Sequence, residues 1–150
     1  VDGPVKGHDF RRGRSAAVNI APSTTGAAIA VGRVIGQLKG KFDGVAIRVP
    51  VLSGSLSAIT FLAERATSVE EVNKILEEAA SDGRWKGILA ITRDQLVSTD
   101  IMGDAHPAIV DLSLTRVVDG DLVAVYSWYD NEFGYTNALV EHVVKAAENL

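Results

Sequence analysis

The sequence has no cysteine at any of its 150 positions, which excludes disulfide bonds, thiolate metal sites and a cysteine nucleophile within these residues. It also has no excess of positive charge, because 15 Lys and Arg residues stand against 19 Asp and Glu and give a net charge of −4. This balance argues against a general nucleic-acid binder. No apolar run approaches the roughly 18 residues that a membrane-spanning helix needs. We therefore expect a cytoplasmic protein with no membrane or nucleic-acid partner.

Histidines are too few and too widely spaced to indicate a metal site. The three are His8, His106 and His142, and none has a second ligand at a spacing typical of zinc centres. The rest of the composition is that of an ordinary globular protein, with 47% hydrophobic and 23% charged residues. A chain of this length can bury about 70% of its unfolded surface, so one compact unit is expected.

Apolar side chains that recur every three or four residues predict three helices. Either Thr67 or Ser68 can cap the second of them, because a glutamate lies three residues beyond each. The first expected helix spans residues 27–38. The second begins at residue 67 or 68 and ends at residue 82, and the third spans residues 139–147. Short β-branched and aromatic runs predict strands at residues 45–49, 56–62, 87–91, 96–99, 108–114 and 122–129, and residues 1–14 are predicted to form a loop. This order of elements indicates an α+β sheet layer with helices packed on it.

Two segments in the first third of the chain could bind an anion. Residues 22–26, Pro-Ser-Thr-Thr-Gly, lie directly before the first helix, where free backbone N–H groups attract negative charge. The alternative is that one of the hydroxyl groups simply caps the helix, as such groups do at most helix starts. Arg48 is the only charged residue in the apolar run 44–50. Its guanidinium could hold a carboxylate or phosphate through two hydrogen bonds, or it could project into solvent from an edge strand.

A third candidate segment, residues 127–135, places four aromatic and two acidic side chains between the last strand and the last helix. An asparagine there, Asn131, could pair with an amide through its donor and its acceptor. The alternative is aromatic core packing, with Asp130 or Asn131 capping the helix.

Six sequence patches occur in an order that resembles glyceraldehyde-3-phosphate dehydrogenase. The patches are VDGP, FRRGR, NIAPSTTGAA, GKFDGVAIRVPV, GILAITRDQLVSTDI and SWYDNEFGY, and they extend over nearly all 150 residues. The resemblance implies that residues 1–150 form the C-terminal portion of that family's catalytic domain. It also implies an α+β fold with a mixed or antiparallel sheet and helices packed on one face. The NAD-binding Rossmann domain and the segment bearing the nucleophile have no counterpart in this chain.

The resemblance also assigns roles to particular residues. Thr25 and Gly26 match the family's threonine and glycine at the inorganic-phosphate pocket, and Arg48 matches its arginine for the substrate phosphate. Asn131 matches the asparagine that holds the carboxamide of the nicotinamide in NAD. The family's cysteine nucleophile and the histidine that lowers its pKa have no counterpart here, so no catalytic residue is expected in this chain.

The activity implied by the resemblance is that of an oxidoreductase of glycolysis. Glyceraldehyde 3-phosphate, inorganic phosphate and NAD would yield 1,3-bisphosphoglycerate through a thioester on a cysteine outside this chain, in a homotetramer. These residues alone would be inactive, and hydrophobic surface would stay uncovered without the N-terminal part of the enzyme. The alternatives are an erythrose-4-phosphate dehydrogenase and a non-catalytic assembly or binding module derived from the family.

Overall fold

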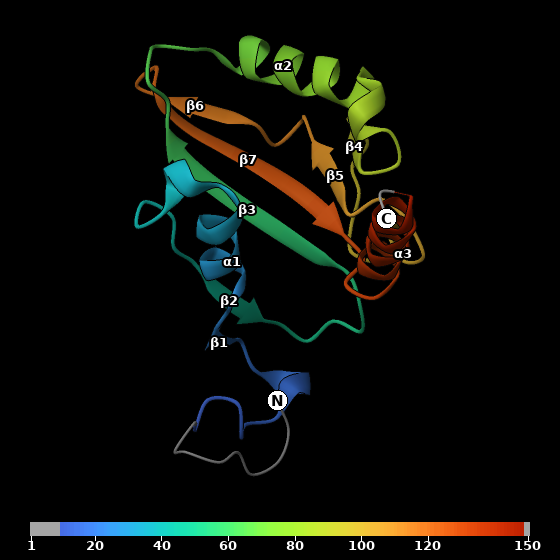
Figure 1. Cartoon of the computed structure of the whole chain (residues 1–150). Helices are drawn as coiled ribbons and strands as arrows, with labels where there is room; N and C mark the ends of the chain where they lie inside the picture. Colours follow the sequence, from blue (N-terminus) through green and yellow to red (C-terminus); the bar gives the residue numbers. More distant parts are fainter. Residues whose placement is uncertain (1–9, 149–150) are drawn as a thin grey trace. The chain divides into compact units, whose positions relative to one another are not determined.

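The computed structural model describes residues 10–148, and His8 therefore lies outside the described part. The chain divides into two units, residues 1–52 and 53–150, which are described separately below (Figure 1). The expectation of one compact unit is wrong for this chain. The physical reason lies in the strand pairing, because two strands form one sheet and five form another, with no strand shared between them.

The first unit is built on a two-stranded antiparallel ladder. Strand β1 (Ala21–Thr24) pairs with β2 (Val45–Arg48), and helix α1 (Ala27–Val34) lies between them in the sequence. The predicted helix is shorter than expected, because the backbone of Ile35 leaves the helical region with φ −108° and ψ 88°. A 3₁₀ turn follows at Gly36–Leu38, and another precedes β1 at Ala16–Val18. Sequence periodicity gave no indication of β1, because its four residues include a proline and two hydroxyl residues.

The second unit contains a mixed five-stranded sheet in the order β3-β7-β5-β4, with β6 also paired to β7. The pair β4 and β5 is parallel, whereas β3, β5 and β6 all run antiparallel to β7. Helix α2 joins β3 to β4, and helix α3 follows β7 (Figure 1). The prediction of an α+β fold with a mixed sheet is confirmed. The bounds are β3 Ser55–Leu62, α2 Val69–Ser81, β4 Leu89–Thr92, β5 Ala108–Asp111, β6 Arg116–Val118, β7 Leu122–Tyr129 and α3 Phe133–Ala147, with a 3₁₀ turn at Gly83–Trp85.

One predicted strand, at residues 96–99, is wrong. The backbone N–H of Val97 donates to a carboxylate oxygen of Asp100 at 2.7 Å, and the N–H of Asp100 donates to the Val97 carbonyl at 3.0 Å. These two bonds close a turn, which uses the backbone groups that a strand would offer to a neighbour.

Helix α2 begins as its sequence predicts. Ser68 is the cap, and its hydroxyl accepts a hydrogen bond from the Glu71 backbone N–H at 3.2 Å. The Glu71 carboxylate accepts hydrogen bonds from the guanidinium of Arg65 and, at 2.8 Å, from the hydroxyl of Thr67. These hydrogen bonds, that of Arg65 foremost, lower the pKa of Glu71 to about 2.

The depressed pKa of Glu71 predicts a dependence of stability on pH. A carboxyl whose folded pKa lies below its unfolded value of about 4.3 stabilises the fold above that value, and loses this contribution as the pH falls towards the folded pKa. Urea unfolding of Glu71→Gln and the unsubstituted protein should therefore differ most at pH 7, differ less at pH 3, and converge only as the pH falls to the folded pKa of about 2 or below. Glu78→Gln, an exposed position on the same helix, serves as the control. An equal difference at both pH values would contradict this role of Glu71.

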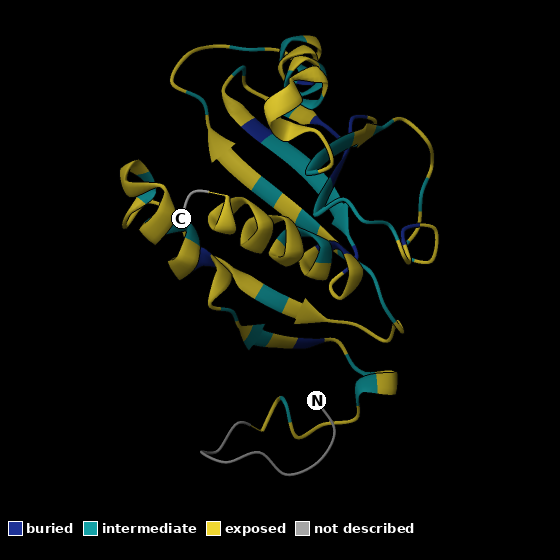
Figure 2. Cartoon of the chain, turned by 45° about the vertical axis from the view of Figure 1, so that its right-hand side comes forward, coloured by how far each residue is buried: buried dark blue, intermediate teal, exposed yellow. Residues whose placement is uncertain are grey.

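The core of the second unit is small, because few of its described residues are buried (Figure 2). Many large apolar side chains lie outside it. Beside α2 an open groove of about 720 Å³ is lined by apolar side chains of β3, β7 and α2, and within it Ile75 is 55% exposed and Leu62 73%. The apolar residues of α3 are also exposed. This agrees with the expectation of uncovered hydrophobic surface. None of the helices within residues 10–148 combines the length and apolarity needed to cross a bilayer. The buried apolar residues of this unit are Ile101, Ile109, Val110, Leu112 and Val123.

Candidate functional site

Thr25 and Gly26 form the junction between β1 and α1. The hydroxyl of Thr25 accepts a hydrogen bond from the Ala27 backbone N–H at 3.2 Å, and Gly26 is the residue at the cap position. A Cβ atom built on Gly26 would have no neighbour within 4 Å, so the backbone here is open to a ligand. Of the two alternatives left by the sequence, the structure shows Thr25 partly satisfying the helix start, while the approach to the backbone of Gly26 remains free.

A positive charge lies beside this junction. The guanidinium of Arg12 donates to the Thr24 hydroxyl at 3.2 Å and to the Thr24 carbonyl at 3.4 Å. From the sequence, Arg12 was placed only within the loop predicted at residues 1–14 and in the FRRGR patch. Its contact with Thr24 joins positions 12 residues apart, which no local pattern predicts. Together, Arg12 and the helix N-terminus make this end of β1 electropositive.

Arg48 occupies the other end of the same ladder. It is the last residue of β2, it is exposed, and it pairs with Ala21 at the start of β1. Among residues 10–148 its guanidinium has no hydrogen-bond or ion-pair partner. Four residues of extended chain separate Ala21 from Thr25, which corresponds to about 13 Å. This backbone separation makes Arg48 and Thr25 candidates for two separate anion sites.

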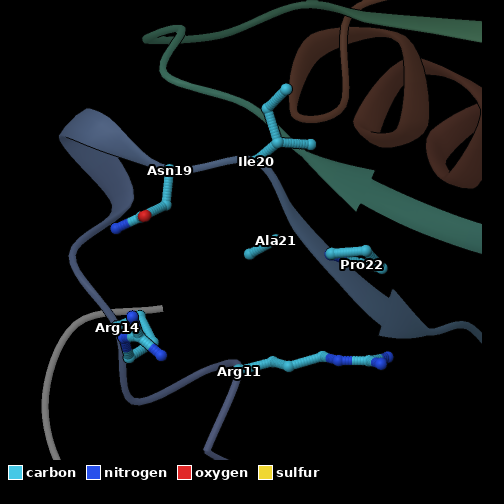
Figure 3. Close-up of a pocket in the computed structure, with 6 residues that line it drawn as sticks. All are labelled: Arg11, Arg14, Asn19, Ile20, Ala21 and Pro22. Atoms are coloured by element: carbon cyan, nitrogen blue, oxygen red, sulfur yellow. The ribbon is translucent and has the colours of Figure 1, made fainter.

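A hollow of about 230 Å³ also lies in the first unit, beneath β1. Figure 3 shows the side chains of Arg11 and Arg14 at this hollow, with Arg11 extending along the strand and away from Arg14. Because the two guanidinium groups point apart, they do not converge on a common anion. The remaining lining residues are Asn19, Ile20, Ala21 and Pro22.

In the second unit, Asp130 connects β7 to α3. One oxygen of its buried carboxylate accepts from the backbone N–H groups of Glu132 at 2.9 Å and Phe133 at 2.8 Å, and the other accepts from Gly103 at 2.9 Å. These backbone hydrogen bonds, with Gly103 the largest cause, lower the pKa of Asp130. Asp130 is thus the residue that satisfies the start of α3, which leaves its neighbour Asn131 free of any capping role.

Asn131 itself is exposed just beyond the end of β7, and within residues 10–148 its side chain makes one hydrogen bond. The hydroxyl of Ser55 donates to its Oδ1 at 2.5 Å. The Nδ2 group of Asn131 has no partner within the described residues, so two N–H donors remain available. A free amide donor beside an acceptor fits the carboxamide of nicotinamide, which is itself a primary amide.

The comparisons with known proteins identify the family of the chain. A family model described as the C-terminal domain of glyceraldehyde 3-phosphate dehydrogenase matches residues 1–131. The chain belongs to this family. The glyceraldehyde-3-phosphate dehydrogenase of Mycobacterium bovis BCG is 49% identical over 149 residues, which cover 99% of this chain and 43% of that protein. The corresponding protein of Streptomyces coelicolor is 49% identical over 142 residues, covering 95% of this chain and 42% of its own length. That of Zymomonas mobilis is 44% identical over 142 residues, with the same coverage.

Within the glyceraldehyde-3-phosphate dehydrogenase family, then, this chain spans less than half the length of the curated relatives it matches. The first unit holds Thr25, Gly26 and Arg48, whereas the second holds Asn131. The sequence did not point to two neighbours of these residues, Arg12 and Ser55. The sequence carries no signal for the second of these, because Ser55 and Asn131 are 76 positions apart and meet only through the pairing of β3 with β7.

Proposed function

We propose that this chain is the phosphate-facing and nicotinamide-facing part of a phosphorylating, NAD-dependent glyceraldehyde-3-phosphate dehydrogenase of glycolysis. One observation carries the proposal: the ladder of β1 and β2 presents separate electropositive groups at its two ends, about 13 Å apart along the strand. A reaction that joins a phosphorylated aldehyde to inorganic phosphate requires two anion sites. An aldehyde oxidation that uses water instead of phosphate requires only one anion site, for the phosphate of the substrate.

The roles follow from the chemistry of each side chain. Arg48 would hold the phosphate of glyceraldehyde 3-phosphate through its planar fork. Thr25 and Gly26 would hold inorganic phosphate through a hydroxyl and the open backbone of the helix start, with Arg12 adding positive charge. Asn131 would orient the carboxamide of the nicotinamide and so select the ring face. When bound, NAD supplies the hydride acceptor of the reaction.

The remaining part of the enzyme would supply what this chain lacks. The chain has no cysteine, so the thioester from which phosphate releases 1,3-bisphosphoglycerate would form on a cysteine elsewhere in the protein. The same remaining part, and the other subunits of a homotetramer, would cover the exposed apolar residues of the groove beside α2 and of α3. We place the assembled enzyme in the cytoplasm.

The test is a substrate comparison in the full-length protein. Reduction of NAD is measured with glyceraldehyde 3-phosphate and with erythrose 4-phosphate, each in the presence and absence of inorganic phosphate. The proposal requires a higher kcat/KM for the three-carbon aldehyde and a rate that depends on phosphate. A preference for erythrose 4-phosphate without phosphate dependence would support the erythrose-4-phosphate dehydrogenase instead. No activity with either aldehyde would support a non-catalytic module.

A further inference from the structure

Ser55 lies where the first residue of β3 meets the end of β7. It pairs with Tyr129, so Asn131 is two residues beyond its strand partner. The hydroxyl of Ser55 and Oδ1 of Asn131 are 2.5 Å apart. This separation belongs to the O–H···O range and is well below the usual N–H···O value of about 2.9 Å. The contact therefore places the oxygen of the Asn131 amide towards Ser55 and the nitrogen away from it.

The backbone on both sides of this contact is fixed by other interactions. Gly54 has a φ of 85°, and its position is packed so closely against the Ser98 carbonyl that a Cβ would lie 2.6 Å from the oxygen. Asp130 is held by three backbone N–H groups. What these interactions leave undetermined is the rotation of the Asn131 amide. Among the described residues, the Ser55 hydroxyl is the group that hydrogen-bonds this amide.

We propose that Ser55 is a positioning residue that holds the Asn131 amide with its nitrogen facing outward, so that Nδ2 donates to the carbonyl oxygen of the nicotinamide carboxamide. The inference rests on the proposed function, in which Asn131 contacts that carboxamide. For a carboxamide whose oxygen faces Asn131, a rotated Asn131 amide would present oxygen to oxygen, so the orientation of Asn131 decides whether this face of the carboxamide is attracted or repelled. Ser55 itself touches neither the cofactor nor the substrate in this account.

A neighbouring serine provides a matched control. The hydroxyl of Ser53 donates to Oε2 of Glu132 at 3.1 Å, and Ser53 lies two residues before Ser55, in the segment that leads into β3. Removing it takes away one hydroxyl and one hydrogen bond from the same region. It leaves the Ser55 contact with Asn131 in place, so Ser53→Ala reports what the loss of a hydroxyl does to the segment alone.

The experiment measures the affinity of the full-length protein for NAD and for ADP-ribose, which lacks nicotinamide, by calorimetry. Loss of one neutral hydrogen bond corresponds to a change of about 2- to 12-fold in affinity. We expect Ser55→Ala to weaken NAD binding within that range and to leave ADP-ribose binding unchanged. Ser53→Ala should change neither. Combining Ser55→Ala with Asn131→Ala should weaken NAD binding no further than Asn131→Ala does alone, because Ser55 acts through that amide.

Other outcomes separate the possible failures. If Ser55→Ala weakens NAD and ADP-ribose equally, or matches Ser53→Ala, the positioning role is overturned while the proposed function stands. If Asn131→Ala also leaves NAD affinity unchanged, the proposed contact between Asn131 and nicotinamide fails and the positioning role fails with it. Should Ser55→Ala not fold, the pair Ser55→Thr and Ser55→Val replaces it, since the two side chains match in shape and only threonine keeps the hydroxyl. Equal NAD affinities for that pair would also overturn the proposal.

Discussion

Replacing Gly54 by alanine is expected to lower the free energy of unfolding by about 2–5 kcal/mol, the sum of a left-handed backbone and an overpacked contact. Gly54 has a φ of 85°, in the region that favours glycine. Its Cβ would lie 2.6 Å from the Ser98 carbonyl oxygen and 3.3 Å from Cδ1 of Ile101, which is 2% exposed. Neither neighbour can move without disturbing the turn or the core. The start of β3 would have to shift instead, and Ser55 with it.

Gly87→Ala is the matched control for this measurement. Gly87 has a φ of 74°, but a Cβ there would meet nothing within 4 Å. Alanine at this position should therefore cost only the conformational part, about 1–2 kcal/mol. Urea unfolding of both variants gives the comparison. Equal losses for the two variants would show that the close approach of Gly54 to Ser98 contributes nothing.

In the full-length protein, and given the proposed function, replacing Arg48 by alanine is expected to lower kcat/KM for glyceraldehyde 3-phosphate by about 10- to 150-fold. This range corresponds to the loss of a charge-assisted hydrogen bond worth about 1.5–3 kcal/mol. The kcat/KM for unphosphorylated glyceraldehyde should stay the same, because that substrate has no phosphate for the guanidinium to hold. With glyceraldehyde 3-phosphate, the kcat/KM of Arg48→Lys should lie between those of Arg48→Ala and the unsubstituted protein, since lysine keeps the charge and loses the planar fork.

The control for Arg48 is Arg33→Ala, which removes an exposed guanidinium from the last turn of α1 in the same unit. This variant changes the net charge by the same amount, so it accounts for long-range electrostatic attraction of the substrate. We expect its kcat/KM to be close to that of the unsubstituted protein. If Arg33→Ala and Arg48→Ala reduce the rate alike, Arg48 has no specific role in binding phosphate.

The elements that sequence predicted well have strong local signals. Helix α2 has a capping serine and an apolar stripe, and β3 and β7 are long β-branched or aromatic runs. Helix α3 starts at Phe133, before the predicted residue 139, because Asp130 satisfies its first N–H groups. The short strands β1 and β6 were missed. Each has only three or four residues and depends on its partner strand for stability.

The candidate site shows the same contrast between local sequence signals and tertiary contacts. Thr25, Gly26, Arg48 and Asn131 could be proposed from sequence, by resemblance to the family, because each belongs to a contiguous motif. Their neighbours Arg12 and Ser55 were not found. The contact of Arg12 with Thr24 depends on how a loop folds back on β1, and that of Ser55 with Asn131 depends on strand register. Both are tertiary contacts, which periodicity and residue type do not encode.

The measurement that tests the central claim most directly compares two preparations in one assay of aldehyde- and phosphate-dependent NAD reduction. One is the chain of residues 1–150 alone, and the other is the full-length protein before and after alkylation of its thiols. Because these 150 residues contain no cysteine, the account predicts no activity from the chain alone. It predicts activity from the full-length protein that alkylation abolishes. Aldehyde oxidation by the chain alone, or activity of the full-length protein that survives complete alkylation, would contradict the account.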